Sequence, residues 1–202
     1  MILLPPPRRL RSCSVVVVAD VVGSDDGVSH LGETVAEFDR RVDALFDRLR
    51  GEPTIDRLFL TASSLGDWSL VWHLLGLARG ISRRRPDQVI ALAVALGVES
   101  LVVNQGIKRL FRRPRPTTAG ADGLGVRSPS TSAFPSGHAS SAAFAATLLI
   151  RWDGRRWAPL WLAVAAVVAV SRVHVRIHHA SDVVAGALTG HLLARLMRRI
   201  VR

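Results

Sequence analysis

The basic stretch KRLFRRPRP lies where an apolar segment of the chain ends, and two of its cations, Lys108 and Arg115, are candidates for binding an anion. Lys108 and Arg115 are seven residues apart, so they lie near one face if the preceding helix continues, and Pro114 and Pro116 restrict the backbone around Arg115. A helix end that presents two fixed cations to a loop can hold an anion. The same cluster is typical of the Lys and Arg residues that border a membrane span, and the stretch taken alone favours that interpretation.

A second motif, PSGH, begins a run of small residues, ASSAAFAA, that continues as helix. Pro135 fits a first helical turn, and Ser136 and Gly137 offer backbone N–H groups that no bulky side chain obstructs. Unpaired N–H groups at a helix N-terminus, together with the positive end of the helix dipole, form an anion site. His138 would stand close to that anion, although a lone histidine here is also an ordinary polar boundary residue.

The third motif, SRVHVRIHHASD, combines histidines with a carboxylate. His174, His178 and Asp182 are spaced four apart, so in a helix they share one face. Asp182 can accept the Nδ1–H of His178 and sharpen the other ring nitrogen as a nucleophile, although His179 competes for this assignment. Imidazole and carboxylate ligands at this spacing also suit zinc, so a metal site stays open at this point.

The three motifs together match the needs of phosphoryl transfer. Arg172 ends an apolar run, where a cation is costly in hydrocarbon unless it has an anionic partner. A site that binds a phosphate and transfers its phosphoryl group needs several fixed cations, backbone donors, a nucleophile and a proton donor, and the chain has candidates for each. Its single cysteine, Cys13, excludes an internal disulfide and a cysteine-based zinc site.

The chain that must position these motifs is apolar and basic, with 49% hydrophobic residues and a net charge of +11. Five mostly apolar segments approach the roughly 20 residues that cross a bilayer as helix. They indicate a multi-pass transmembrane helical bundle of about five spans, with the buried helices of a soluble bundle as the rival. The segments are Leu58–Ala78, Gln88–Ile107, Ala133–Ile150, Trp157–Val173 and Ser181–Met197.

An amphipathic helix is predicted in front of these segments, over residues 34–50. Apolar residues recur there at helical spacing opposite a charged face, and Thr34 with Glu37 suits a capping box at its start. Such a helix lies either against other helices or in the membrane interface. Residues 1–33 are predicted to be a loosely ordered arm, and residues 58–202 the membrane-embedded domain.

Loop charge indicates the orientation of the bundle. Five spans place the basic stretches of residues 81–87, 151–156 and 195–202 on one face, which should be cytoplasmic. The loop of residues 108–132 is then on the outer face although it too is basic, so its cations are expected to be retained for binding. Nucleic acid is the weaker explanation of the charge, because aromatic residues are 5% and none interleave a basic stretch.

In this order, the three motifs resemble those of the type 2 phosphatidic acid phosphatase superfamily, which also includes bacterial acid phosphatases and vanadium haloperoxidases. KRLFRRPRP fits the pattern K, six residues, R-P; FPSGHAS contains P-S-G-H; and SRVHVRIHHASD fits S-R, five residues, H, three residues, D. The resemblance runs from about Leu58 to the C-terminal end of the sequence. Three gapped motifs in register make it specific.

The resemblance implies an all-helical fold and a metal-independent phosphohistidine mechanism without a cofactor. By position, His178 is the nucleophile, Asp182 orients and polarises it, and His138 protonates the leaving oxygen and then activates water. The resemblance also favours His178 over His179 and argues against a metal site. The residues that it assigns to the phosphate oxygens are Lys108, Arg115, Ser136, Gly137 and Arg172.

We therefore expect a multi-pass plasma-membrane enzyme that removes the terminal phosphate of a lipid phosphate or polyprenyl (di)phosphate, with its site on the extracytoplasmic face. The alternatives are a vanadate-dependent haloperoxidase-like enzyme, because the same constellation can hold vanadate, and a non-catalytic membrane scaffold. Membrane members of the family commonly have six spans, whereas five are evident here. The missing one would be the first, where the only apolar run, Ser14–Val22, is interrupted by Asp20.

Overall fold

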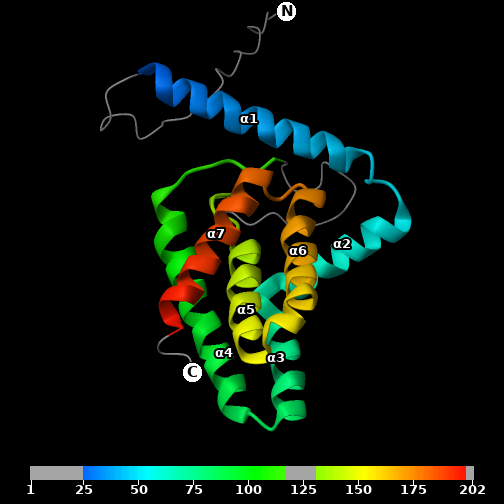
Figure 1. Cartoon of the computed structure of the whole chain (residues 1–202). Coiled ribbons are helices and arrows are strands. Elements are labelled where there is room, and N and C mark those ends of the chain that lie inside the picture. The colour runs from blue at the N-terminus through cyan, green and yellow to red at the C-terminus, as the bar shows by residue number, and fades with distance from the viewer. Residues whose placement is uncertain (1–24, 117–130, 199–202) are drawn as a thin grey trace, which may run out of the picture.

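The computed structural model describes residues 25–116 and 131–198, and these residues form helices and connections without a β-strand (Figure 1). The predicted all-α class is confirmed. The predicted arm up to residue 24 and most of the loop of residues 108–132 lie outside the described residues. The α-helices are α1 (Asp25–Asp47), α2 (Pro53–Gly66), α3 (Leu70–Arg83), α4 (Pro86–Ser100), α5 (Gly137–Asp153), α6 (Ala158–His174) and α7 (Ala180–Met197).

Helix α5 lies inside the bundle and has its most extensive packing with α7 and α6. Helix α1 lies across one end of the bundle, and the α3–α4 turn lies at the opposite end (Figure 1). Because α5, α6 and α7 alternate in direction, the N-terminus of α5, the C-terminus of α6 and the N-terminus of α7 meet at the α1 end. The second and third motifs occupy these three helix ends.

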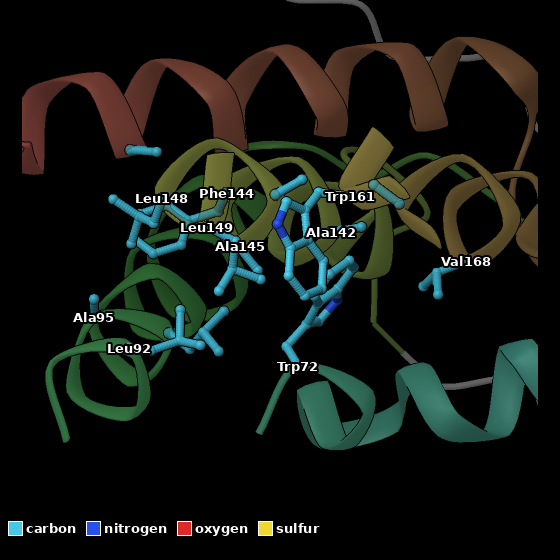
Figure 2. Close-up of a cluster of buried hydrophobic side chains, with 14 residues drawn as sticks. Trp72, Leu92, Ala95, Ala142, Phe144, Ala145, Leu148, Leu149, Trp161 and Val168 are labelled. Atoms are coloured by element: carbon cyan, nitrogen blue, oxygen red, sulfur yellow. The ribbon is translucent and has the colours of Figure 1, made fainter. Parts of the chain in front are cut away.

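Large side chains from four helices fill the core of the bundle (Figure 2). Trp72 of α3, Leu92 of α4, Phe144 of α5 and Trp161 of α6 are each at most 6% exposed. Interlocked side chains of this size restrict the movement of one helix against the next. The core therefore fixes α5, which begins within the second motif, against its neighbours.

Small residues let α5 and α7 approach closely near the motifs. A Cβ added at Gly186 or Gly190 of α7 would overlap the carbonyl oxygen of Ser136 or Ser140, respectively. Glycines four residues apart lie on one face of a helix and allow backbone contact, as in membrane helix pairs. This contact holds the PSGH segment against the first turns of α7.

The predicted segment Leu58–Ala78 is not one helix. Helix α2 ends at Gly66, and Trp68 and Ser69 have left-handed backbone conformations with φ of 54° and 58° before α3 begins. At the end of α2, Gly66 packs so closely on the His138 ring that an added Cβ would lie 2.5 Å from its Cδ2 atom. The break places Asp67 beside His138.

Helix α1 begins by Asp25, earlier than the predicted start at Thr34. The Thr34 hydroxyl donates to the His30 carbonyl oxygen at 2.8 Å inside the helix, so the predicted capping box is wrong. Val42 and Phe46 pack against buried residues of α5, α6 and α7, so part of this helix contacts the bundle. Three large apolar side chains of the predicted helix region remain exposed, namely Phe38, Leu45 and Leu49, as does Leu31 earlier in α1.

Two helices among the described residues are long and apolar enough to cross a membrane. They are the continuous helical stretch Pro86–Leu110, with a mean hydropathy of 1.7, and Arg155–His174, with 1.4. The basic α3–α4 turn lies at the end of the bundle opposite α1 (Figure 1).

Candidate active site

The turn between α6 and α7 holds His178. Helix α6 ends at His174, and the His178 N–H donates to the Arg172 carbonyl oxygen at 3.1 Å. Arg176 closes this turn in the left-handed conformation, with φ of 53°. The predicted common helical face of His174, His178 and Asp182 is therefore wrong, because His178 lies in the turn and Asp182 in the first turn of α7.

His174 takes part in a separate contact between α2 and α6. Its Nε2 atom lies 2.7 Å from Asp56 Oδ1, and its ring centroid lies 4.6 Å from that of Phe59. The open alternative of a zinc site on His174, His178 and Asp182 thus lacks the geometry it requires. Within residues 25–116 and 131–198, no group of three His, Cys, Asp or Glu residues is placed to hold a metal ion.

His178 lies between a carboxylate and a guanidinium. Its Nδ1 atom is 3.7 Å from Asp182 Oδ2, and its Nε2 atom is 3.2 Å from Arg115 Nη1. The first distance is longer than a hydrogen bond, and Nδ1 has no other partner in the described part of the chain. Nδ1 can therefore donate a hydrogen bond to Asp182 once the two groups move slightly closer. Nε2, on the other side of the ring, faces the Arg115 guanidinium.

Burial sets the protonation state of His178, which is 3% exposed. Desolvation lowers its pKa to about 3, the positive charges of Arg115 and Arg172 contribute to the shift, and the nearby carboxylate of Asp182 opposes it. The imidazole is therefore neutral across the physiological pH range. A neutral imidazole carries the lone pair that a nucleophile needs.

The second motif forms the N-terminus of α5. The helix begins at Gly137 with Ser136 as N-cap, whose hydroxyl accepts the Ala139 N–H at 3.4 Å. Pro135 therefore precedes the cap, and its predicted place in the first turn is wrong. The Ser136 N–H donates to the Asp182 carbonyl oxygen at 3.0 Å, which ties this N-terminus to that of α7.

Lys108 reaches the same helix N-terminus from the other side. A Cβ added at Gly137 would lie 2.9 Å from Asn104 Oδ1 and 3.6 Å from Lys108 Nζ, so glycine leaves room for both groups. After α4 the chain stays helical only to Leu110, first as a π-helical stretch (Leu101–Gly106) and then as a 3₁₀ turn (Ile107–Leu110). Arg115 lies beyond this end, in a segment that is not helical. Lys108 and Arg115 meet at one end of the bundle through tertiary packing and not through a shared helix face.

His138 stands in the first turn of α5 and contacts α2 and the break after it. Its Nε2 atom lies 3.1 Å from Asp67 Oδ1 and 3.2 Å from the Ser63 carbonyl oxygen. The guanidinium of Arg172, which is 3% exposed, donates to the Ser63 hydroxyl. Sequence analysis missed Ser63 and Asp67, although an acidic residue inside an otherwise apolar segment was a usable signal.

Arg113 is a third residue that the sequence motifs did not identify. It donates to Asp182 Oδ1 at 2.6 Å and to Asp39 Oδ2 at 2.6 Å, so it joins α1 to α7. The motif selects Arg115 by its spacing from Lys108, but nothing in the pattern FRRPRP gives Arg113 a role that its neighbour Arg112 lacks. The burial of Asp39 is equally unpredictable from the sequence, because the helical pattern places Asp39 on the charged face of the amphipathic helix.

All eight residues predicted for the site gather at the α1 end of the bundle through the contacts described above. They supply cations, a buried neutral imidazole, a second imidazole and a helix N-terminus. These are the groups that bind a phosphate and stabilise the charge that develops in phosphoryl transfer. The fold and this site define a helical protein of the phosphatase class.

The chain belongs to the PAP2 superfamily, whose family model matches residues 88–202. It is 36% identical over 130 residues to a decaprenylphosphoryl-5-phosphoribose phosphatase of Mycobacterium tuberculosis, covering 63% of this chain and 70% of that protein. A phosphatase of the same name from Mycolicibacterium smegmatis is 31% identical over 141 residues, with 68% and 74% covered.

Two solved structures share the fold. A transmembrane PAP2-type phosphatidylglycerolphosphate phosphatase from Bacillus subtilis superposes with a TM-score of 0.64 and 23% identity, covering 83% of this chain and 86% of that one. LpxE of Aquifex aeolicus gives a TM-score of 0.64 and 22% identity, covering 81% and 94%. The predicted family is thereby confirmed, and the superposed region extends beyond the residues matched by the family model.

Proposed function

We propose that this protein is a membrane phosphatase that hydrolyses the terminal phosphate of a lipid phosphate or polyprenyl (di)phosphate through a phosphohistidine intermediate. The observation that carries the proposal is the placement of His178 Nε2, 3.2 Å from Arg115 Nη1. A phosphate attacked by this nitrogen has its oxygens within reach of the guanidinium, which neutralises the charge that develops on them.

In the first half-reaction, His178 Nε2 forms a bond to phosphorus while the bond from phosphorus to the lipid oxygen breaks. His138 gives a proton to that oxygen, so the lipid leaves as an alcohol, or as a shorter phosphate if the substrate is a diphosphate. Asp182, 3.7 Å from Nδ1, moves into hydrogen-bond distance and stabilises the positive charge that His178 gains.

In the second half-reaction, His138 takes a proton from water, whose oxygen attacks phosphorus. The bond to His178 Nε2 breaks, and inorganic phosphate leaves. Lys108, the Gly137 N–H and Arg172 complete the set that holds the oxygens, and the Ser136 hydroxyl contributes by capping the helix that carries Gly137. No metal ion takes part in these steps.

The substrate class is proposed from the relatives and from the apolar surface beside the site. The two mycobacterial relatives are named as phosphatases of a decaprenyl-linked phosphosugar, so a polyprenyl chain that carries a terminal phosphate monoester is the first class to test. Leu101, Val102 and Leu110 are exposed apolar residues of the helical stretch that leads to Lys108. A prenyl or acyl chain in the bilayer can lie against such a surface while its phosphate enters the site.

The site is proposed to face the extracytoplasmic side of a multi-pass plasma-membrane protein. The basic α3–α4 turn lies at the end opposite the site, which supports a cytoplasmic location for that end. At the α1 end, the exposed Leu31, Phe38 and Leu45 lie on one face of α1, since seven residues are close to two helical turns. This face is suited to contact with the membrane interface.

The proposal predicts that purified, detergent-solubilised protein releases inorganic phosphate from a polyprenyl phosphate sugar or a lipid phosphate in the presence of a metal chelator. His178→Ala should abolish this release, because no phosphohistidine can form. His191→Ala is a matched control, since His191 is exposed on α7 and its ring contacts the Thr147 hydroxyl. Release that needs added metal, or that survives His178→Ala, would contradict the proposal.

A further inference from the structure

Helix α1 buries one carboxylate in the molecule although most of its charged residues face solvent. Asp39 is 7% exposed, whereas its neighbours Arg40 and Arg41 have side chains that are 68% and 77% exposed. A carboxylate this deeply buried is costly unless it is paired and hydrogen-bonded. Helix α1 also lies outside residues 88–202, so the family model does not account for Asp39.

Both oxygens of Asp39 are engaged by groups next to the site. Oδ1 accepts the backbone N–H of Ser181 at 2.8 Å, and Oδ2 accepts the Ser181 hydroxyl at 2.8 Å and Arg113 Nη2 at 2.6 Å. Ser181 immediately precedes Asp182. Asp39 therefore holds the start of α7 by its backbone and by its side chain.

Arg113 continues the contact to the carboxylate that faces His178. Its Nη1 atom donates to Asp182 Oδ1 at 2.6 Å and to the Ser181 hydroxyl at 2.7 Å. The other oxygen of Asp182 accepts the His179 N–H at 2.9 Å and is the one that lies 3.7 Å from His178 Nδ1. The groups thus form a continuous chain, Asp39 to Arg113 to Asp182 to His178.

We propose that Asp39 is a positioning residue that balances the charge of Arg113, so that Asp182 keeps both its orientation and its negative charge for His178. One guanidinium shared by two carboxylates interacts less strongly with each than it would with one alone. Without Asp39, Arg113 would pair with Asp182 alone and neutralise more of its charge. The His178 imidazolium that forms during phosphoryl transfer would then be less stabilised by Asp182. The inference rests on the proposed function, because it assigns Asp39 to that same site.

The test compares Asp39→Asn with wild type in the detergent-solubilised full chain, using the best phosphate monoester substrate and orthovanadate as inhibitor. Vanadate bonded to His178 resembles the pentacoordinate transition state, so its inhibition constant reports how well the nucleophile is positioned. We expect kcat to fall about tenfold or more, KM to change less than about threefold, and the vanadate inhibition constant to rise by a factor similar to the loss of kcat.

A purely structural role gives a different result. If Asp39→Asn only lowers the folded fraction, kcat falls while the vanadate inhibition constant is unchanged, and that outcome would overturn the inference. Unchanged kcat would overturn it as well. Glu37→Gln is the matched control, since Glu37 is also a paired carboxylate of α1 but pairs only with the exposed Arg40 and Arg41.

A double-mutant cycle tests whether Asp39 acts through Arg113. Arg113→Gln combined with Asp39→Asn should cost little more activity than Arg113→Gln alone, because both changes interrupt one chain. Independent, additive losses would contradict the inference. The proposed function is tested first and separately, by comparing wild type with His178→Ala. If the proposed function is wrong, wild type shows no phosphate release that depends on His178, and this is known before any Asp39 variant is measured.

Discussion

At the residue scale, the site is a set of charges that compensate one another around one neutral imidazole. Burial and two guanidiniums keep the proton off His178. In the proposed mechanism, Asp182, 3.7 Å from Nδ1, stabilises the positive charge that His178 gains when it bonds to phosphorus. His138 has its own carboxylate neighbour, Asp67, at 3.1 Å. The two histidines therefore have different electrostatic surroundings, as the nucleophilic and acid–base roles proposed for them require.

The low pKa of His178 predicts how activity depends on pH. Because the folded pKa is about 3, the imidazole stays neutral from pH 8 down to about pH 5, and its protonation does not limit kcat/KM in that range. A pH profile of phosphate release on a substrate whose phosphate does not titrate in the range measures this. A fall in kcat/KM centred near the ordinary pKa of histidine, and assigned to His178 by NMR titration, would contradict the prediction.

The same shift has a consequence for stability with a definite sign. An unfolded histidine takes up a proton near pH 6.5, whereas folded His178 does so near pH 3, so the unfolded state binds more protons between these values. The free energy of unfolding therefore falls as pH drops from 6.5 toward 3. Wild type should lose more thermal stability than His178→Asn between pH 7 and about pH 4.

At the element scale, the site depends on how closely α5 and α7 pack. Gly186 and Gly190 allow the α7 backbone to lie against the carbonyl oxygens of Ser136 and Ser140. Ser136 is at once the N-cap of α5 and a donor to the Asp182 carbonyl oxygen. A displacement of α7 therefore moves the α5 N-terminus, which is proposed to bind the phosphate, relative to the His178–Asp182 pair.

Two glycine-to-alanine changes separate packing from helix propensity. Gly190→Ala should lower the melting temperature in detergent, because its Cβ overlaps the Ser140 backbone, with a cost of about 1–3 kcal/mol. Gly97→Ala, on α4, meets nothing within 4 Å and should leave stability unchanged or raise it, by up to about 1 kcal/mol. Equal effects of the two changes, measured by thermal unfolding of purified variants, would contradict this account of α5–α7 packing.

At the scale of the whole molecule, the candidate site and the α3–α4 turn lie at opposite ends of the fold. Helix α1 lies over the site end, and the α3–α4 turn with its arginines lies at the other (Figure 1). Two helical stretches, Pro86–Leu110 and Arg155–His174, are long and apolar enough to cross a membrane between these ends. The proposed orientation places the end that carries the α3–α4 turn in the cytoplasm.

Cysteine labelling in intact cells tests this orientation. In a Cys13→Ser background, Arg40→Cys on α1 should react with a membrane-impermeant maleimide added from outside, because the Arg40 side chain is 68% exposed at the site end. Arg84→Cys, in the exposed α3–α4 turn, should react only after the membrane is permeabilised. The reverse pattern would show that the site faces the cytoplasm.

Sequence alone identified the helical class, the family and the eight residues that gather at the site, because motif residues and hydrophobic segments are local properties of the chain. It did not locate the break after Gly66, the turn that removes His178 from a helical face, or the start of α1, since each depends on contacts with distant segments. Spacing of four residues predicts a common face only while the helix continues, and α6 ends at His174.

Only the tertiary structure decided which polar residues support the site. Arg112 and Arg113 are neighbours in one basic stretch, yet packing brings Arg113 to Asp182 and Asp39. Asp39 and Asp67 carry the same charge as every other Asp in the chain, and their tertiary neighbours distinguish them: Asp39 is buried against Arg113, and Asp67 lies beside His138. The sequence shows the residue types that can bind phosphate. The positions of the groups that orient and charge-balance them depend on packing between distant segments, which no local pattern predicts.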